Sequence, residues 1–254
     1  RKRGFQDYSD SGSDMLHKPL AFQIAKATLQ KAKEAIPGTK ESFWSYKLYS
    51  GPEGQEVKVH YCKSKHTTER VAHYFLNEKA IGFDIEWKPG SSKNSGAKSN
   101  VSLIQIASET RIGLFHIAAF AKDMISDLVA PTFKEIMEDP NITKIGVAVK
   151  ADCTRLRNFL EIDSRGLFEL SHLYKLVKHS SSGDIGLINR KLVSLSTQAE
   201  QYLELPVFKG DVRGSDWSQP LGMDQIICKY QSDWSQRIRA YLIKSPFQML
   251  LQMH

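Results

Sequence analysis

The chain has few cysteines and no long hydrophobic run, and each absence excludes a class of protein. Its three cysteines, Cys62, Cys153 and Cys228, are far apart, which excludes a disulfide framework and a Cys-x-x-Cys zinc site. No stretch approaches the roughly 20 apolar residues of a membrane span, so we expect no membrane partner. The chain is therefore expected in a reducing, intracellular compartment, and we favour the nucleus over the mitochondrion or the cytoplasm.

The composition favours a folded domain that binds a polyanion. Hydrophobic residues make up 41% of the 254 residues, which is enough for a full core. The net charge is +7 and the isoelectric point is about 9.2. A basic surface of this kind attracts nucleic acid, although many basic proteins bind none.

Two carboxylates occur inside a segment that otherwise has the pattern of a buried strand. Because a strand alternates faces, Asp84 and Glu86 point one way. Phe83, Ile85 and Trp87 point the other way. Two like charges side by side at a half-buried position are costly unless a cation lies between them. Hard carboxylate oxygens favour Mg²⁺ or Mn²⁺, which indicates phosphoryl-transfer chemistry rather than acid-base chemistry on a sugar.

The alternative interpretation is that Asp84 and Glu86 lie on the solvated face of an edge strand. The preceding residues 80–83 are apolar on both faces, however, and this pattern is typical of a central strand covered by helices. We therefore favour the metal site.

The chain divides into an N-terminal extension, residues 1–42, a domain of residues 43–244 and a tail of residues 245–254. The first residues of the extension have the composition of a disordered segment. Apolar and basic residues then recur at helical spacing over residues 20–36, until Pro37 and Gly38 end the pattern. This helix either caps the domain or forms a basic tether for nucleic acid.

The domain has the alternating pattern of an α/β fold. We expect strands over residues 57–62, around Asp84, and over 101–107, 111–117 and 142–149. The strand around Asp84 and the two that follow it form a meander. Helices are expected over residues 67–77, 121–138, 154–160, 167–178, 195–203 and 223–243. We expect a flexible basic loop over residues 89–100 and a surface loop over 179–188. Asp152 follows the last strand at a strand-to-helix junction, where open α/β sheets keep their sites.

Four motifs in this order carry a resemblance to a known family. They are Gly82-Phe83-Asp84-Ile85-Glu86-Trp87, Ser102-Leu103-Ile104-Gln105-Ile106-Ala107, Gly146-Val147-x-x-Lys150-x-Asp152 and Ser215-Asp216-Trp217-Ser218-Gln219-Pro220-Leu221. Residues 43–241 resemble the DEDD superfamily of 3'-5' exonucleases, and are most similar to the Werner-syndrome exonuclease and RNase D-like group. The resemblance implies a ribonuclease H-like fold, a central mixed five-stranded sheet flanked by helices. It also implies metal-dependent removal of nucleotides from the 3' end of DNA or RNA.

The resemblance implies a role for each carboxylate in a site that holds two ions, Mg²⁺ or Mn²⁺. Asp84 would bridge both ions, Glu86 would hold the ion beside the nucleophile, and Asp152 would orient the second ion, partly through water. Trp87 would lie near the 3'-terminal nucleotide and stack on its base, unless it packs in the core instead. Four basic residues are candidates for contacts with backbone phosphates: Lys93, Lys98, Lys209 and Arg213.

The last family motif, Tyr-x-x-x-Asp, is altered in this chain. Matching Asp233 to the family aspartate places Lys229 at the tyrosine and implies one inserted residue upstream. Matching Cys228 to the tyrosine instead places Ser232 at the aspartate. We favour Asp233, because Arg239-Ala240-Tyr241 then falls near the closing motif of the family.

Tyr230 lies three residues before Asp233, and residues at this spacing share a helix face. Its hydroxyl would then replace that of the missing tyrosine, or its ring belongs to a core stripe of the same helix. The damaged motif leaves a second function open. The domain would then bind nucleic acid or a protein partner without cleaving.

Overall fold

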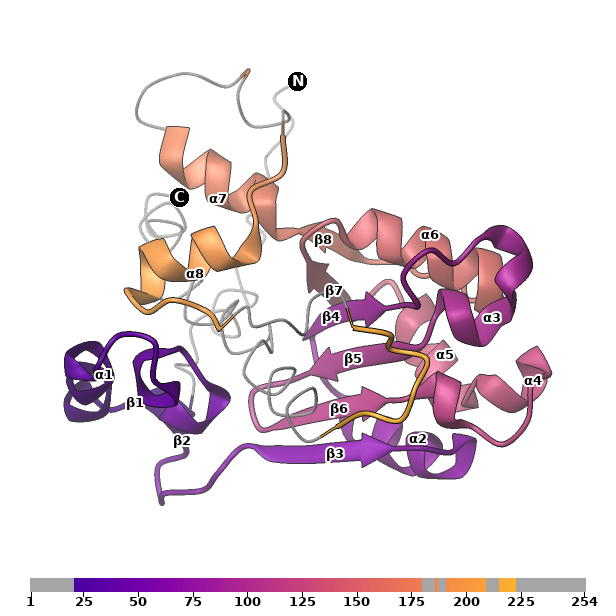
Figure 1. Cartoon of the computed structure of the whole chain (residues 1–254), viewed down its shortest axis with the longest axis horizontal. Helices are drawn as coiled ribbons and strands as arrows, with labels where there is room; N and C mark the ends of the chain where they lie inside the picture. The colour runs from indigo at the N-terminus through magenta and orange to yellow at the C-terminus, as the bar shows by residue number, and fades with distance from the viewer. Residues whose placement is uncertain (1–20, 180–185, 187–190, 209–214, 223–254) are drawn as a thin grey trace, which may run out of the picture.

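The computed structural model describes residues 21–179, 186, 191–208 and 215–222, and Figure 1 shows their arrangement. Within these residues, six strands form the central sheet in the order β3-β6-β5-β4-β7-β8. Their bounds are Lys58–Cys62 (β3), Ala80–Glu86 (β4), Leu103–Ala107 (β5), Arg111–Phe115 (β6), Thr143–Gly146 (β7) and Leu167–Glu169 (β8).

The sheet is mixed, as the resemblance implies. Strands β4, β5 and β6 pair antiparallel and form the expected meander. Strands β3, β7 and β8 pair parallel to their neighbours β6, β4 and β7. This mixed sheet with helices on its faces is a ribonuclease H-like fold with six strands rather than the expected five.

The helix that we expected over residues 167–178 is partly wrong, because its first three residues form the additional strand. Residues Leu167–Glu169 form β8 and pair with β7 at Lys144 and Gly146, and helix α7 covers only Leu170–His179. The apolar spacing of α7 continues backwards over these three residues, so the sequence pattern alone extends the helix too far. The pairing with β7 decides the conformation.

Other expected segments also differ from the structure. The expected helix over residues 121–138 is two helices, α4 (Ile125–Leu128) and α5 (Pro131–Glu138). Pro131 disfavours a helical conformation at the residue before it, so the chain breaks there. The expected flexible loop of residues 89–100 contains η5 (Lys93–Ser95) and α3 (Gly96–Asn100). The hydroxyl oxygens of Ser92 and Ser95 cap η5, because they accept short-range hydrogen bonds from backbone N–H groups. The expected helix 223–243 lies outside the described residues.

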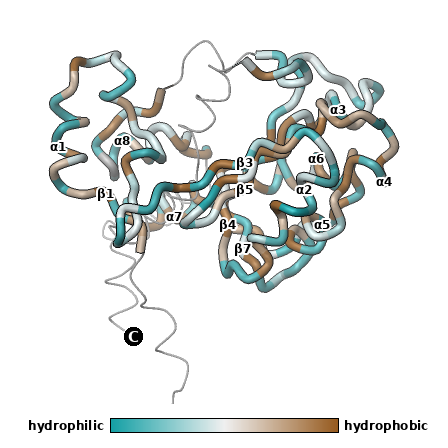
Figure 2. Tube along the Cα trace, turned by 90° about the horizontal axis from the view of Figure 1, so that it is seen from below, coloured by the Kyte–Doolittle hydropathy of each residue, from teal (hydrophilic) through white to brown (hydrophobic). Residues whose placement is uncertain are grey.

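The two larger of the three apolar clusters among the described residues pack on opposite faces of the sheet, and the third lies between β7 and α7. The first joins the apolar face of β4 to α2 (Lys65–Ala72), α5 and α6 (Val149–Leu160). The second lies on the other face of the sheet, under α1 (Lys26–Glu34) and α8 (Leu195–Leu203). Figure 2 shows α1 and α8 side by side at one end of the molecule and α2, α4 and α5 at the other. An ion pair between Lys33 and Glu204 ties α1 to the end of α8.

The described part of the N-terminal extension packs on the domain. Strand β1 (Gln23–Ile24) pairs with β2 (Tyr49–Ser50), and the helix expected over residues 20–36 is α1. Phe22 and Ala32 belong to the second apolar cluster, which favours the capping role of this helix over a free tether. The remaining short helices are η2 (Lys40–Ser42), η3 (Tyr46–Leu48), η4 (His73–Phe75) and η6 (Ile117–Ala119). No helix among the described residues is long and apolar enough to cross a membrane.

Candidate catalytic centre

The carboxylates of Asp84 and Glu86 lie on one face of a central strand. Strand β4 is paired on both sides, with β5 and β7, so the edge-strand interpretation is wrong. Phe83 and Ile85 point to the opposite face and are 1% and 2% exposed. Asp84 and Glu86 are half-buried, so both carboxylates are partly removed from water.

Gln105 holds the carboxylate of Asp84 from the neighbouring strand. It is the cross-strand partner of Asp84, and its Nε2 donates a hydrogen bond to Asp84 Oδ2 at 3.0 Å. Its Oε1 atom is buried and has no hydrogen-bond partner among the described residues. An amide donor orients the carboxylate without neutralising it. We did not assign Gln105 to the site from the sequence, although a single polar residue in the apolar strand β5 is a signal for it.

A tight turn between β7 and α6 brings in the third carboxylate. A Cβ at Gly146 would lie 2.8 Å from the carbonyl oxygen of Phe83, so only glycine lets β7 approach β4 this closely. Ala148 then adopts a left-handed conformation with φ of 60° at the start of α6. Asp152 lies in the first turn of α6 and is 7% exposed. The expected position of Asp152 at a strand-to-helix junction is confirmed.

The three carboxylates are close enough to affect one another. Burial and the charges of Asp84 and Glu86 raise the pKa of Asp152 to about 9, and Glu169 adds a smaller effect. The Arg155 guanidinium opposes these effects. A pKa in this range favours the protonated form of Asp152 at neutral pH.

Glu169 is a nearby carboxylate that sequence reasoning missed, because it lies on the unexpected strand β8. Its Oε2 accepts a hydrogen bond from the Val149 N–H at 3.3 Å, and its Oε1 accepts one from the Ser171 N–H at 3.1 Å. It therefore links the first turns of α6 and α7. These bonds make it a positioning residue for the helix that carries Asp152.

The donor set fits a divalent cation in charge and in chemistry. Oxygen ligands from Asp84, Glu86 and Asp152 are the kind that Mg²⁺ and Mn²⁺ prefer, and a cation would relieve the repulsion that raises the Asp152 pKa. Within the described ranges, no three His, Cys, Asp or Glu side chains converge closely enough to hold a metal ion as they stand. The expected fourth ligand, Asp233, lies outside those ranges, as do Tyr230, Lys209 and Arg213.

An aromatic and a guanidinium are stacked beside the carboxylates. Trp87 follows Glu86 and is 37% exposed, so the expectation that it packs in the core is wrong. The Arg155 guanidinium lies 4.2 Å from the centre of its ring. Arg155 Nη1 also donates to Asn100 Oδ1 at 2.8 Å and to the Asn100 carbonyl at 3.3 Å. Sequence reasoning missed Arg155, although its position three residues after Asp152 on a helix was a signal.

The two described lysines among the phosphate candidates have different surroundings. Lys93 is exposed on η5 and lines a cavity beside α6. Lys98 forms an ion pair with Asp123 at 2.7 Å and donates to the Phe120 carbonyl. A substrate phosphate at Lys98 would therefore compete with Asp123, whereas Lys93 has no such competitor among the described residues.

Residues 215–222 cross in front of β4, β5 and β6 (Figure 1). Trp217 is buried in the second apolar cluster, and its carbonyl accepts a hydrogen bond from His116 Nε2 at 3.1 Å. Burial lowers the pKa of His116, so its ring is neutral and Nδ1 accepts a hydrogen bond from the Tyr61 hydroxyl at 2.6 Å. These contacts fix the chain just before the altered last motif.

Comparisons with known proteins agree with this arrangement. A sequence model of a family described as 3'-5' exonuclease matches residues 59–233, more than half of the chain. No curated protein sequence matches significantly. Among solved structures, the chain is similar to the Nibbler EXO domain of Aedes aegypti, with a TM-score of 0.59 and 18% identity, over 76% of this chain and 88% of that one.

The chain is also similar to two RNase D structures. For Escherichia coli RNase D, an exoribonuclease, the TM-score is 0.55 and the identity 18%, over 78% of this chain and 45% of that one. For Trypanosoma brucei RNase D in complex with RNA U12, the TM-score is 0.56 and the identity 12%, over 74% and 62%. The chain thus spans about half of the Escherichia coli protein. At these identities the likeness shows the fold.

Proposed function

The chain belongs to the family of 3'-5' exonuclease domains, and we propose that it hydrolyses nucleotides from the 3' end of DNA or RNA with two Mg²⁺ or Mn²⁺ ions. One observation carries the proposal. The half-buried carboxylates of Asp84 and Glu86 on a central strand lie near the buried Asp152, and burial together with their negative charges raises the pKa of Asp152 to about 9. The repulsion and the burial of these carboxylates destabilise the fold, and a bound cation would relieve both effects. Strongly shifted pKa values of this kind are typical of functional sites.

Each carboxylate has a part in this proposal. Asp84, Glu86 and Asp152 would hold the ions, and Asp233 of the last motif would supply the fourth carboxylate. When bound, divalent ions supply an activated water and stabilise charge on the leaving oxygen. Gln105 keeps Asp84 in one orientation through its hydrogen bond, so the strand presents a fixed ligand. Asp152 gives up its proton when it becomes a ligand.

The substrate contacts follow from the exposed side chains near the carboxylates. The exposed Trp87, backed by the Arg155 guanidinium, offers an aromatic face on which a base stacks. Lys93 is the described lysine best placed to contact a phosphate, and Lys209 and Arg213 remain candidates. The similarity to an RNase D structure solved with RNA supports a nucleic-acid partner.

A second candidate function is binding of nucleic acid or of a protein partner without cleavage. One observation favours it: Lys229 stands where the family tyrosine belongs in the register that we prefer.

The test is digestion of single-stranded DNA and RNA oligonucleotides that carry a 5' label. Active protein produces a ladder of products shortened from the 3' end with Mg²⁺ or Mn²⁺, and none with EDTA. Oligonucleotides that are bound but stay intact with both metals favour the second function. Cleavage in EDTA contradicts the metal site.

A further inference from the structure

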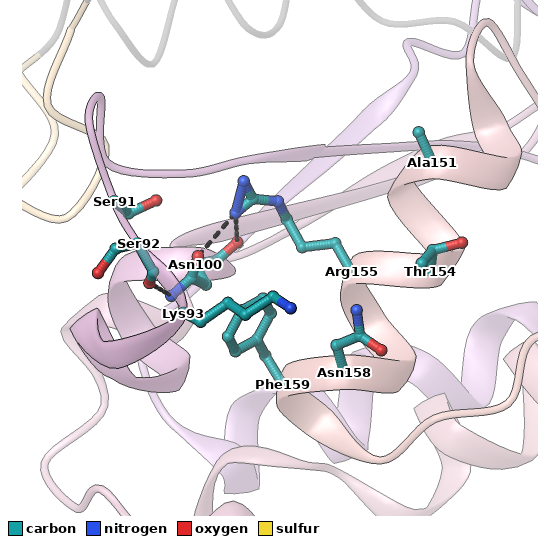
Figure 3. A pocket seen from close by; sticks show the side chains of 9 residues that line it. All are labelled: Ser91, Ser92, Lys93, Asn100, Ala151, Thr154, Arg155, Asn158 and Phe159. Atoms are coloured by element: carbon teal, nitrogen blue, oxygen red, sulfur yellow. Dashed lines mark hydrogen bonds between the residues drawn. The ribbon is translucent and has the colours of Figure 1, made fainter.

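A second group of cations lies at an edge of the sheet, away from the carboxylates. The cations of the cavity beside α6, Lys93 and Arg155, belong to the substrate contacts proposed above (Figure 3). Strand β3 forms the edge of the sheet opposite to β8, and its outer side pairs with no strand among the described residues. The cations and the aromatic ring that gather there form the β3-edge patch, namely Lys58, Arg70, Tyr74 and Arg111.

The register of the sheet places the β3-edge patch on the face opposite to the carboxylates. Asp84 pairs with Gln105, and the same row continues through Leu114 to Tyr61 on β3. Because side chains alternate along a strand, Lys58 points to the other face. Three strand spacings of about 4.8 Å separate β3 from β4, so the patch lies more than about 14 Å from Asp84.

The cations of the patch are not neutralised by any described carboxylate. Lys58 is the cross-strand partner of Arg111, so two like charges lie side by side and repel each other. Neither of them, nor Arg70, forms an ion pair within the described part of the chain. Burial and the charges of Arg111, Lys58 and Arg70 lower the pKa of His60, so the three cations lie around one ring. Such a surface favours an anionic ligand.

An aromatic stack holds the guanidinium of Arg111 at the surface. It lies 4.3 Å from the centre of the Tyr74 ring, which stacks on His60 and is 51% exposed. Nε of Arg111 donates to Thr110 Oγ1 at 3.3 Å, and among the described residues Nη1 and Nη2 donate no hydrogen bond. These two nitrogens are therefore oriented before a ligand arrives, and arginine binds phosphate through two such donors.

A further cation lies on the carboxylate side of the same edge. Lys63 directly follows β3, is exposed, and its Nζ lies 5.9 Å from the centre of the Tyr61 ring. Tyr61 belongs to the row of Asp84, so cations are present on both sides of β3. A ligand that passes around the edge and carries a phosphate at every step would contact all of them. A nucleic-acid backbone has this property, whereas a peptide with one phosphate does not.

We propose that the β3-edge patch is a second contact surface for the phosphate backbone of nucleic acid, several nucleotides away from the 3' end. The inference rests on the proposed function, which supplies the ligand, and adds a surface outside the carboxylate site. At a rise of about 3.4 Å per nucleotide, a span of about 14 Å takes about four nucleotides. A trinucleotide in the carboxylate site is therefore too short to reach the patch, and a dodecamer is long enough.

The test measures binding of a 5'-fluorescein-labelled single-stranded dodecamer and of a labelled trinucleotide in an Asp84→Asn background, which prevents cleavage. Lys58→Gln combined with Arg111→Gln should weaken dodecamer binding about 10-fold or more. The salt slope should fall by about 1.4, as expected for two lost phosphate contacts on a single strand. The same double variant should bind the trinucleotide within twofold of the parent, which also shows that the carboxylate site is still folded.

Two matched variants separate charge from packing and from net charge. Arg111→Lys keeps the positive charge beside Tyr74 and should bind the dodecamer within about threefold of the parent. Lys31→Gln removes an exposed lysine from α1, which packs on the other face of the sheet, and should change dodecamer binding less than twofold.

The outcomes distinguish this surface from the proposed hydrolysis. If the double variant binds the dodecamer as tightly as Lys31→Gln does, the patch does not contact nucleic acid. An equal loss of trinucleotide binding, or displacement of the dodecamer by an equimolar peptide with one phosphoserine, would also overturn the proposal. A selective loss of dodecamer binding, together with a wild type that never cleaves, would overturn the hydrolysis and keep the patch.

Discussion

Phe83 and Ile85 are 1% and 2% exposed, whereas Asp84 and Glu86, their neighbours on β4, are half-buried on the opposite face. The first pair belongs to the larger apolar cluster and stabilises the fold by leaving water. The second pair is only partly removed from water, and its charges repel the third carboxylate, Asp152. One face of β4 thus stabilises the fold, whereas the other face destabilises it. Such a trade-off between stability and activity is common at active sites.

The largest expected effect comes from the acidic face. Asp84→Asn should lower the rate of 3'-end shortening by about 10³-fold or more. The reason is that Asp84 would hold the metal ions, whose stabilisation of the transition state is worth several kcal/mol. The free energy of unfolding should stay the same or rise, since one of the repelling charges is gone. Oligonucleotide digestion and urea unfolding of the same preparation measure both. A near-normal rate would contradict the metal site.

The next effect concerns the altered motif. Asp233→Asn should reduce cleavage by orders of magnitude if Asp233 is the fourth ligand. Tyr230→Phe should cost about 10- to 100-fold if its hydroxyl positions the attacking water. Ser232→Ala is the control for the other register and should leave the rate unchanged. If an active protein tolerates both Asp233→Asn and Tyr230→Phe, the preferred register is wrong.

The apolar face gives an effect of the opposite kind. Phe83→Ala should lower the free energy of unfolding by about 3–5 kcal/mol, because it leaves a cavity in a packed core. Phe83→Leu should cost much less, since leucine fills more of the space. Denaturant unfolding measures both variants. Equal stability of Phe83→Ala and the wild type would show that this face is not a core.

The last expected effect is a pH dependence of the stability of the metal-free protein. The pKa of Asp152 is about 9 in the fold and about 3.8 when the chain unfolds, so folding favours the protonated form. The stabilisation is complete at low pH and is lost as the pH rises toward 9. In EDTA, Asp152→Asn should remove this loss and exceed the wild type by more than about 1 kcal/mol at pH 8. Parallel stability curves for the two proteins from pH 5 to 9 would contradict this.

The sequence predicted the parts of the site that depend on local pattern. The alternation along β4 separated Asp84 from Phe83, and the position of Asp152 after an apolar strand placed it at a helix start. Both follow from periodicity and from the turn at Gly146. The meander of β4, β5 and β6 also followed from the order of three consecutive strand patterns along the chain.

The parts that were missed depend on contacts between distant residues. Strand β8 forms because it pairs with β7, and three residues carry too little pattern to show this. Arg155 meets Trp87 and Asn100 only after α6 packs against the segment that follows β4. The loop expected over residues 89–100 is ordered by the buried Asn100, whose partners are not evident from composition.

The most direct measurement is calorimetric titration of the metal-free protein with Mn²⁺ at pH 7.5, in two buffers with different ionisation enthalpies. Asp152 carries a proton at this pH, because its pKa is about 9. Binding to the carboxylates should therefore release about one proton per protein, and Asp152→Asn should release none. Binding without proton release, or equal Mn²⁺ affinity in the wild type and Asp84→Asn, would contradict the proposal that these carboxylates hold the catalytic metals.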